Sequence, residues 1–173
     1  MATYTVKLVN HTGATDRLKN AIKSGLQGFF NEVFDKTSDR AVVDWGSGVA
    51  SDAIVLHFVD DVAASYLDQK WPGAAAIRGD AGGHTRTRAH VTGSEFYLHT
   101  VMNGRRASMH DSAYAKLAFH EALHNQWPGW SNADMHGAKG GGGLAASPPQ
   151  LPMTDKNKDL MRRGIAMKNE QLL

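Results

Sequence analysis

The stretch His120-Glu121-Ala122-Leu123-His124 carries the side chains of this chain that are best suited to chemistry. It lies in a run from Asp111 to Trp127 that is rich in Ala and Leu and contains no Gly or Pro, which predicts a helix. Residues four apart on a helix lie on one face, so two imidazoles can point at one metal ion. Glu121 can then lie beside the ion and take a proton from metal-bound water.

A surface helix with two solvated histidines is the competing interpretation of this motif. The neighbouring side chains argue against it, because they carry no charge and predict a buried helix: Leu117, Ala118, Phe119, Ala122 and Leu123. Burying two imidazoles and a carboxylate is costly unless they are paired or bind a metal. The motif therefore predicts a Zn²⁺ site.

The motif supplies two ligands, whereas a catalytic zinc ion usually has three protein ligands and an open position for water. The chain has no cysteine, so the third ligand must be His, Asp or Glu. The segment after the helix offers Asp134 and His136. We favour His136, because Gly137 leaves space beside it and a neutral imidazole suits zinc. Asp134 is the alternative ligand or a hydrogen-bond partner of a ligand histidine, and an exposed loop histidine is the other interpretation of His136.

The rest of the chain predicts an α+β fold, with a mixed twisted sheet of about four to five strands, a backing helix and the motif helix. The backing helix begins at Thr15 or Asp16 and ends near Phe34. A short helix is expected over residues 62–69 and a loop over 71–83. Turns are expected at Thr92-Gly93 and Asn103-Gly104, and Ser108 with Asp111 resembles a capping box. Strands are expected over residues 3–9, 41–45, 52–59 (central, because it is apolar on both faces), 85–91 and 94–101.

A small loop-rich C-terminal subdomain is expected after the motif helix, which Pro128-Gly129 ends. It spans residues 128–173 and ends in a helix that Thr154 caps and that runs to about Glu170. Residues 1–127 form the N-terminal subdomain, and the two parts make one compact domain. The glycine run 140–143 lets the backbone pass close to another group or leaves a mobile rim to a cleft.

Composition limits the partners. The net charge of +2 gives no general attraction to nucleic acid. A strand over residues 84–90 would place His84, Arg86, Arg88 and His90 on one face, for which a solvated surface is the favoured interpretation. No apolar run is long enough to span a membrane, and the first residues lack a signal-peptide layout. The compartment stays open between the cytoplasm and export without a leader.

At residues 120–124 the chain resembles the zincin metallopeptidases, and its order of elements is similar to the metzincin branch. The resemblance implies a zinc-dependent endopeptidase that acts on peptides or proteins, with Glu121 as general base. It also implies a methionine turn beneath the metal, for which Met153 is the best positional match and Met161 the second; an ordinary core methionine is the other interpretation of either. The spacing departs from that branch, because Trp127 and Trp130 occupy the places of its glycine and third ligand. His136 comes twelve positions after His124, and its His-Gly pair is similar to that of the SprT-like zinc proteases.

Two alternatives remain open at this point. One is a zinc hydrolase of a non-protein or cell-wall amide, and the other is a non-catalytic protein with a structural zinc site. A structural site normally has four protein ligands and has no need of Glu121. For a peptide substrate, one of the two strands before the motif helix, with the segment Phe96 to Thr100 as the suggested one, is a candidate sheet edge along which the peptide could add as a strand.

Overall fold

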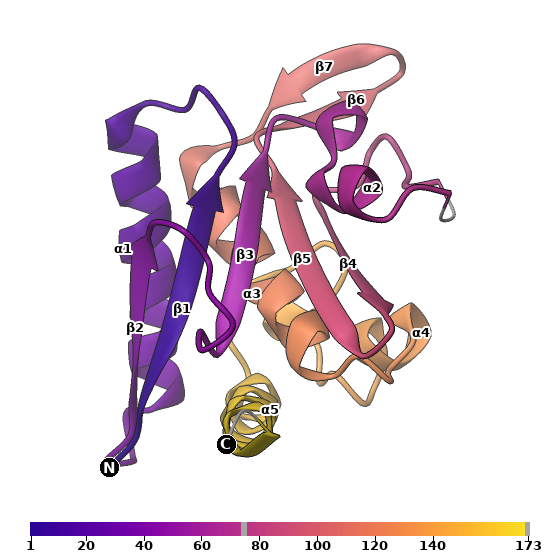
Figure 1. The fold of residues 1–173 in the computed structure, drawn as a ribbon. Helices are drawn as coiled ribbons and strands as arrows, with labels where there is room; N and C mark the ends of the chain where they lie inside the picture. Colours follow the sequence, from indigo (N-terminus) through magenta and orange to yellow (C-terminus); the bar gives the residue numbers. More distant parts are fainter. Residues whose placement is uncertain (74–75, 172–173) are drawn as a thin grey trace.

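A five-stranded mixed sheet forms the centre of the computed structural model, which describes residues 1–73 and 76–171 (Figure 1). The strand order is β2-β1-β3-β5-β4; β1, β2, β3 and β5 run parallel, and β4 pairs antiparallel with β5. The bounds are Thr3–Asn10 (β1), Arg40–Trp45 (β2), Ile54–Val59 (β3), Gly83–Arg88 (β4) and Val91–Tyr97 (β5). The predicted α+β class and the central place of β3 are confirmed. Residues 74–75 of the predicted loop and the last two residues of the predicted C-terminal subdomain lie outside the described residues.

Helices α1 (Asp16–Val33) and α3 (Asp111–Gln126) pack against each other on one face of the sheet (Figure 1). Thr15 caps α1 by accepting a hydrogen bond from the backbone N–H of Leu18, as predicted. The buried side of α1 recurs at helical spacing. At the crossing, a Cβ on Gly25 would lie 2.8 Å from the Cβ of Ala115, so the glycine permits the close approach. The buried residues of α1 are Leu18, Ile22, Leu26, Phe30 and Val33.

The motif helix α3 is enclosed on nearly every side along its second half. Every residue from Ala118 to Gln126 is buried, which confirms the prediction of a buried helix. The predicted capping box is wrong, however. His110 is the N-cap residue, and its ring nitrogen accepts from the backbone N–H of Ser112. Asp111 instead forms an ion pair with Arg17 at 2.6 Å.

The hairpin between β4 and β5 turns at a different place from the predicted one. Ala89 and His90 make the turn at positive φ values of 49° and 65°, whereas Thr92 and Gly93 lie inside β5. Gly93 is needed for packing, because a Cβ there would lie 2.5 Å from Leu67 Cδ2. The predicted basic face is also shortened, since His90 lies in the turn and Arg86 pairs with Asp68 of the short helix α2 (Tyr66–Lys70).

The predicted strand over residues 94–101 is divided in two. β5 ends at Tyr97, and β6 (His99–Met102) pairs with β7 (Arg105–Ser108) in a separate two-stranded sheet. Their turn is at Asn103 and Gly104, as predicted, with φ values of 50° and 73°. The predicted short helix over residues 62–69 is a 3-10 turn, η1 (Val62–Ala64), followed by α2 (Tyr66–Lys70), which lies on the face of the sheet opposite α3 (Figure 1).

The C-terminal part contains α4 (Asn132–His136), a 3-10 turn η2 (Gly143–Ala145) and α5 (Asp155–Gln171). α4 and η2 lie in the segment that was expected to be loop-like. Thr154 caps α5 as predicted, because its hydroxyl accepts from the backbone N–H of Asn157 at 3.1 Å. Leu144, Leu160 and Ile165 join the same hydrophobic core as the sheet and α1. Within the described part of the chain, no helix is long and apolar enough to cross a membrane.

Candidate metal centre

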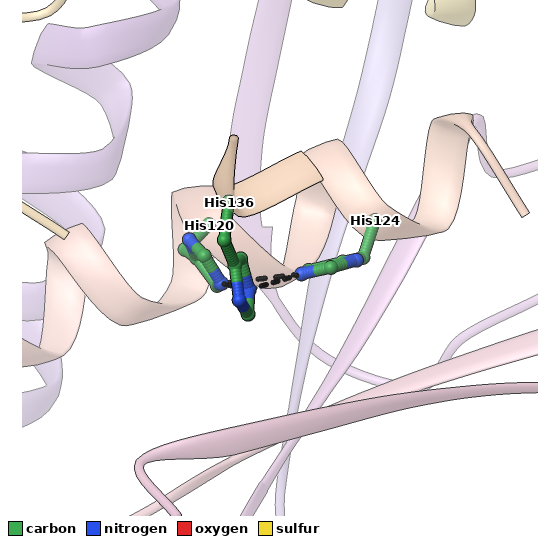
Figure 2. A group of neighbouring side chains, drawn as sticks. All are labelled: His120, His124 and His136. Atoms are coloured by element: carbon green, nitrogen blue, oxygen red, sulfur yellow. Dashed lines mark hydrogen bonds between the residues drawn. The ribbon is translucent and has the colours of Figure 1, made fainter. Parts of the chain in front are cut away.

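Three histidines from two helices converge at one point (Figure 2). His120 and His124 come from α3, and His136 comes from the end of α4. The Nε2 atoms lie 3.2 Å apart for His120 and His124, 3.1 Å for His124 and His136, and 3.2 Å for His136 and His120. The structure therefore brings together the three residues that were predicted from the sequence.

The size of this nitrogen triangle can be compared with what a metal requires. Zinc–nitrogen bonds of 2.0–2.1 Å at tetrahedral angles place the nitrogens roughly 3.3 Å apart. The observed edges of 3.1 to 3.2 Å are close to that value. The three imidazoles could therefore hold one metal ion without rearrangement of the two helices.

Burial keeps the histidine rings in the neutral form, which is the form that binds a metal. It lowers the pKa of His120 to about 4 and that of His124 to about 3, and it also lowers the pKa of His136. His120 Nδ1 lies 2.9 Å from the carbonyl oxygen of Leu144, which can only accept. Nδ1 therefore carries the proton, and the lone pair of Nε2 faces the other two rings.

The segment that presents the Leu144 carbonyl is itself held by Asn157, which is fully buried. The Asn157 amide donates to the carbonyls of Gly140 and Gly142 at 2.9 and 3.0 Å, and its oxygen accepts from the N–H of Leu144 at 2.9 Å. A Cβ on Gly140 would collide with the carbonyl of Met135. The glycine run thus lets the backbone pass close to other groups, one of the two interpretations that the sequence allowed.

Helix α4 aims His136 back at α3. Its N-cap is Ser131, and Asp134 completes a capping box in which its carboxylate accepts from the Ser131 N–H at 3.1 Å. These hydrogen bonds to Ser131 lower the pKa of Asp134. Asp134, the alternative ligand, therefore caps α4, and His136 completes the cluster.

Before α4, Trp127 donates from Nε1 to the carbonyl of Leu160 at 3.0 Å, which fixes the connection between the helices.

Glu121 lies in the same site without belonging to the nitrogen triangle. Its side chain is almost completely buried, and its Oε2 accepts a hydrogen bond of 2.6 Å from the hydroxyl of Thr85 in β4. Burial raises the pKa of Glu121 to about 8, although the Thr85 hydrogen bond opposes the shift. Gly83 makes room for this carboxylate, since a Cβ there would lie 2.6 Å from Glu121 Cγ and 2.8 Å from Oε1.

A cleft of about 740 Å³ opens onto the three histidines and Glu121. Its walls come from the start of β4, the segment 76–82, the strand β6, and residues 147–149. Thr100 of the suggested edge segment lies in β6 of the two-stranded sheet and lines the cleft. Phe96 lies in β5, between β3 and β4, so of the two strands considered, β4 is the one at an edge of the five-stranded sheet. Gly83, His84 and Thr85 of that edge strand line the cleft.

Other parts of the site could not have been found from sequence patterns. Thr85, Leu144 and Asn157 support the motif residues through contacts between distant segments, and only the glycine run near Leu144 gave a signal. Met153 is buried in the hydrophobic core next to Thr154, the cap of α5. Its assignment to a methionine turn stays a prediction.

Comparisons with other proteins give no independent assignment of this site. A scan against protein-family models found no match, and a search of curated proteins found no relative. Any assignment of function therefore depends on the geometry of the cleft, the histidine cluster and Glu121.

Proposed function

We propose that the protein is a zincin-like, zinc-dependent metalloendopeptidase. The observation that supports this proposal best is the combination of three convergent imidazoles with a carboxylate that is not one of them, all facing one cleft. A structural zinc site, which only stabilises the fold, would normally have four protein ligands and no open coordination position. Here the three histidines supply only three ligands, and they face a cleft that is large enough for a segment of peptide.

Each residue then has one role. His120, His124 and His136 hold the zinc ion. Zinc, when bound, supplies an acidified water and polarises the scissile carbonyl. Glu121 takes the proton of the water and returns it to the leaving nitrogen as the peptide bond breaks. Leu144 keeps His120 in the tautomer that binds metal.

The edge strand β4 supports a peptide as the substrate. It pairs with β5 on one side, and three of its residues line the cleft on the other. An extended peptide can pair with such an edge through main-chain hydrogen bonds. Thr85 and Gly83 bring this strand directly beside Glu121, so a peptide on the edge would have its backbone next to the base.

The test is metal analysis followed by digestion of casein and a peptide library, with and without a chelator. We expect one equivalent of zinc, cleavage that the chelator abolishes, and a Glu121→Gln variant that keeps zinc but loses turnover. Stoichiometric zinc without cleavage of any peptide would refute the proposal. The same assay with cell-wall peptides and other amides would then separate a hydrolase of a different substrate from a structural zinc protein.

A further inference from the structure

A chain of hydrogen bonds runs from the C-terminal helix to the carboxylate of Glu121. Lys168 Nζ donates to Asn125 Oδ1 at 2.5 Å, and Asn125 Nδ2 donates to Ser94 Oγ at 3.0 Å. Ser94 Oγ lies 2.8 Å from Thr85 Oγ1, which lies 2.6 Å from Glu121 Oε2. The series of hydrogen bonds connects residues of α5, α3, β5 and β4, and it ends at the carboxylate of Glu121.

The chemistry of the groups gives this chain a single direction. An ammonium group can only donate, so the oxygen of Asn125 faces Lys168 and its NH₂ faces Ser94. When Glu121 is ionised, as its proposed role as base requires, its carboxylate can only accept, so the proton of Thr85 then points at Glu121. Thr85 then has no second proton for Ser94, so the hydroxyl of Ser94 supplies the proton of the 2.8 Å contact with Thr85; its other acceptor, the backbone carbonyl of Glu121, is farther away at 3.4 Å.

Burial makes these bonds hard to replace by water. Ser94 and Asn125 are buried along with Glu121, and the Lys168 ammonium is buried enough that its pKa falls to about 8. Hydrogen bonds in series inside a protein polarise one another, so the loss of one is felt along the chain. The ammonium group of Lys168 therefore affects the strength of the hydrogen bond between Thr85 and Glu121 through the two hydrogen bonds that lie between them.

We propose that Thr85, Ser94, Asn125 and Lys168 are positioning residues that fix the carboxylate of Glu121. The inference rests on the proposed function, in which Glu121 is the base. With Oε2 held by Thr85, the side chain is kept in one rotamer, and Oε1 is the oxygen left to take a proton. The C-terminal helix thus contributes to the reaction without bordering the cleft.

Thr85→Val and Lys168→Met test the chain from its two ends. We expect each to lower kcat on a fluorogenic peptide chosen from the library digest. The fall for Thr85→Val should be roughly ten- to a hundredfold, the range for losing a hydrogen bond to a charged group, with KM changed less than about twofold. Thr85→Ser, which keeps the hydroxyl, should restore most of the activity. Thr87→Val on the same strand, where the hydroxyl bonds to Thr92, is the matched control.

The double variant distinguishes a chain from two separate structural defects. Once Thr85→Val has broken the chain, Lys168→Met should lower kcat no further, whereas independent effects would multiply. Zinc affinity and the free energy of unfolding in urea are measured for each variant, and Lys156→Met on the exposed side of α5 is the control for the loss of a lysine. Multiplicative losses, or losses that follow zinc affinity or unfolding, would overturn the inference.

The metal-free protein provides a readout that needs no activity. A hydroxyl proton held between Thr85 and Glu121 should exchange slowly enough to give its own NMR signal, which Thr85→Val removes and Lys168→Met shifts. No cleavage by the wild-type protein would refute the proposed function and the inference with it. Cleavage that Thr85→Val and Lys168→Met leave unchanged, or a Thr85 signal that Lys168→Met does not shift, would refute the inference alone.

Discussion

Replacing Asn157 by alanine should weaken both the fold and the metal site, although Asn157 touches none of the three histidines in the hydrogen bonds described. Its side chain makes four hydrogen bonds, to the carbonyls of Gly140 and Gly142 and from the N–H groups of Leu144 and Thr154. Together they hold the segment that presents the Leu144 carbonyl to His120. The variant removes all four at once.

The magnitude follows from the number of bonds and their burial. At about 1 kcal/mol of net stability for each hydrogen bond, the four contribute about 4 kcal/mol, and unsatisfied buried partners would add to the cost. Loosening the carbonyl that orients a ligand histidine typically costs about 10- to 100-fold in metal affinity. We therefore expect both effects in Asn157→Ala.

Urea unfolding of the metal-free protein measures the first effect, and titration of zinc against a competing chelator measures the second. Asn31→Ala is the control, because Asn31 lies on the exposed side of α1 and accepts one bond from Gln27. It should change the free energy of unfolding by less than about 0.5 kcal/mol. An Asn157→Ala protein within about 1 kcal/mol of wild type, with unchanged zinc affinity, would refute the reasoning.

Three further predictions concern the site and its surroundings. Gly83→Ala should destabilise the protein by about 1–3 kcal/mol in urea and lower kcat, because its Cβ would lie 2.6 Å from Glu121 Cγ; an unchanged kcat would contradict this. Zinc at a hundredfold excess over its Kd should stabilise the fold by about 2.7 kcal/mol and raise Tm by about 5–11 °C in a thermal scan, and His136→Ala should abolish the rise. Burial, together with the charges of His11 and Lys70, lowers the pKa of His57 to about 4. The native protein therefore binds fewer protons than the unfolded chain between about pH 4 and about pH 6.5. Stability should therefore fall as the pH drops through this window, and His57→Phe should reduce the fall by about 1–3 kcal/mol after allowance for partial exposure; equal pH profiles in urea titrations would contradict this.

Local patterns carried most of the correct predictions. The spacing of His120 and His124 and the uncharged residues around them are properties of one helix, so neither needs knowledge of the fold. His136 could be found because few metal ligands follow α3, and the bounds of α1 follow from its cap and apolar period. The order of strands in the sheet depends on contacts between distant segments, which is why the sequence could not decide which of the two strands before α3 forms the edge.

The errors at the hairpin and at the start of α3 have specific causes. Thr92-Gly93 has the composition of a tight turn, but Gly93 is a glycine because Leu67 occupies the space of its side chain. The turn is formed instead by Ala89 and His90, which adopt positive φ angles that are more common for glycine or asparagine. At α3, a ring nitrogen of His110 replaced the expected hydroxyl as the cap.

The positions of the site residues along the chain have a consequence for the order of folding. The pairs within the histidine cluster are separated by 4, 12 and 16 residues, whereas Glu121 depends on pairings across 36, 31 and 43 residues. Closing short loops costs less entropy, so a partly folded chain can gather the three imidazoles around a metal before the sheet and α5 are in place. Under the proposed function, such a chain would carry zinc but lack a fixed base. The nascent protein would then acquire metal early and become able to cut peptides only when its last helix docks.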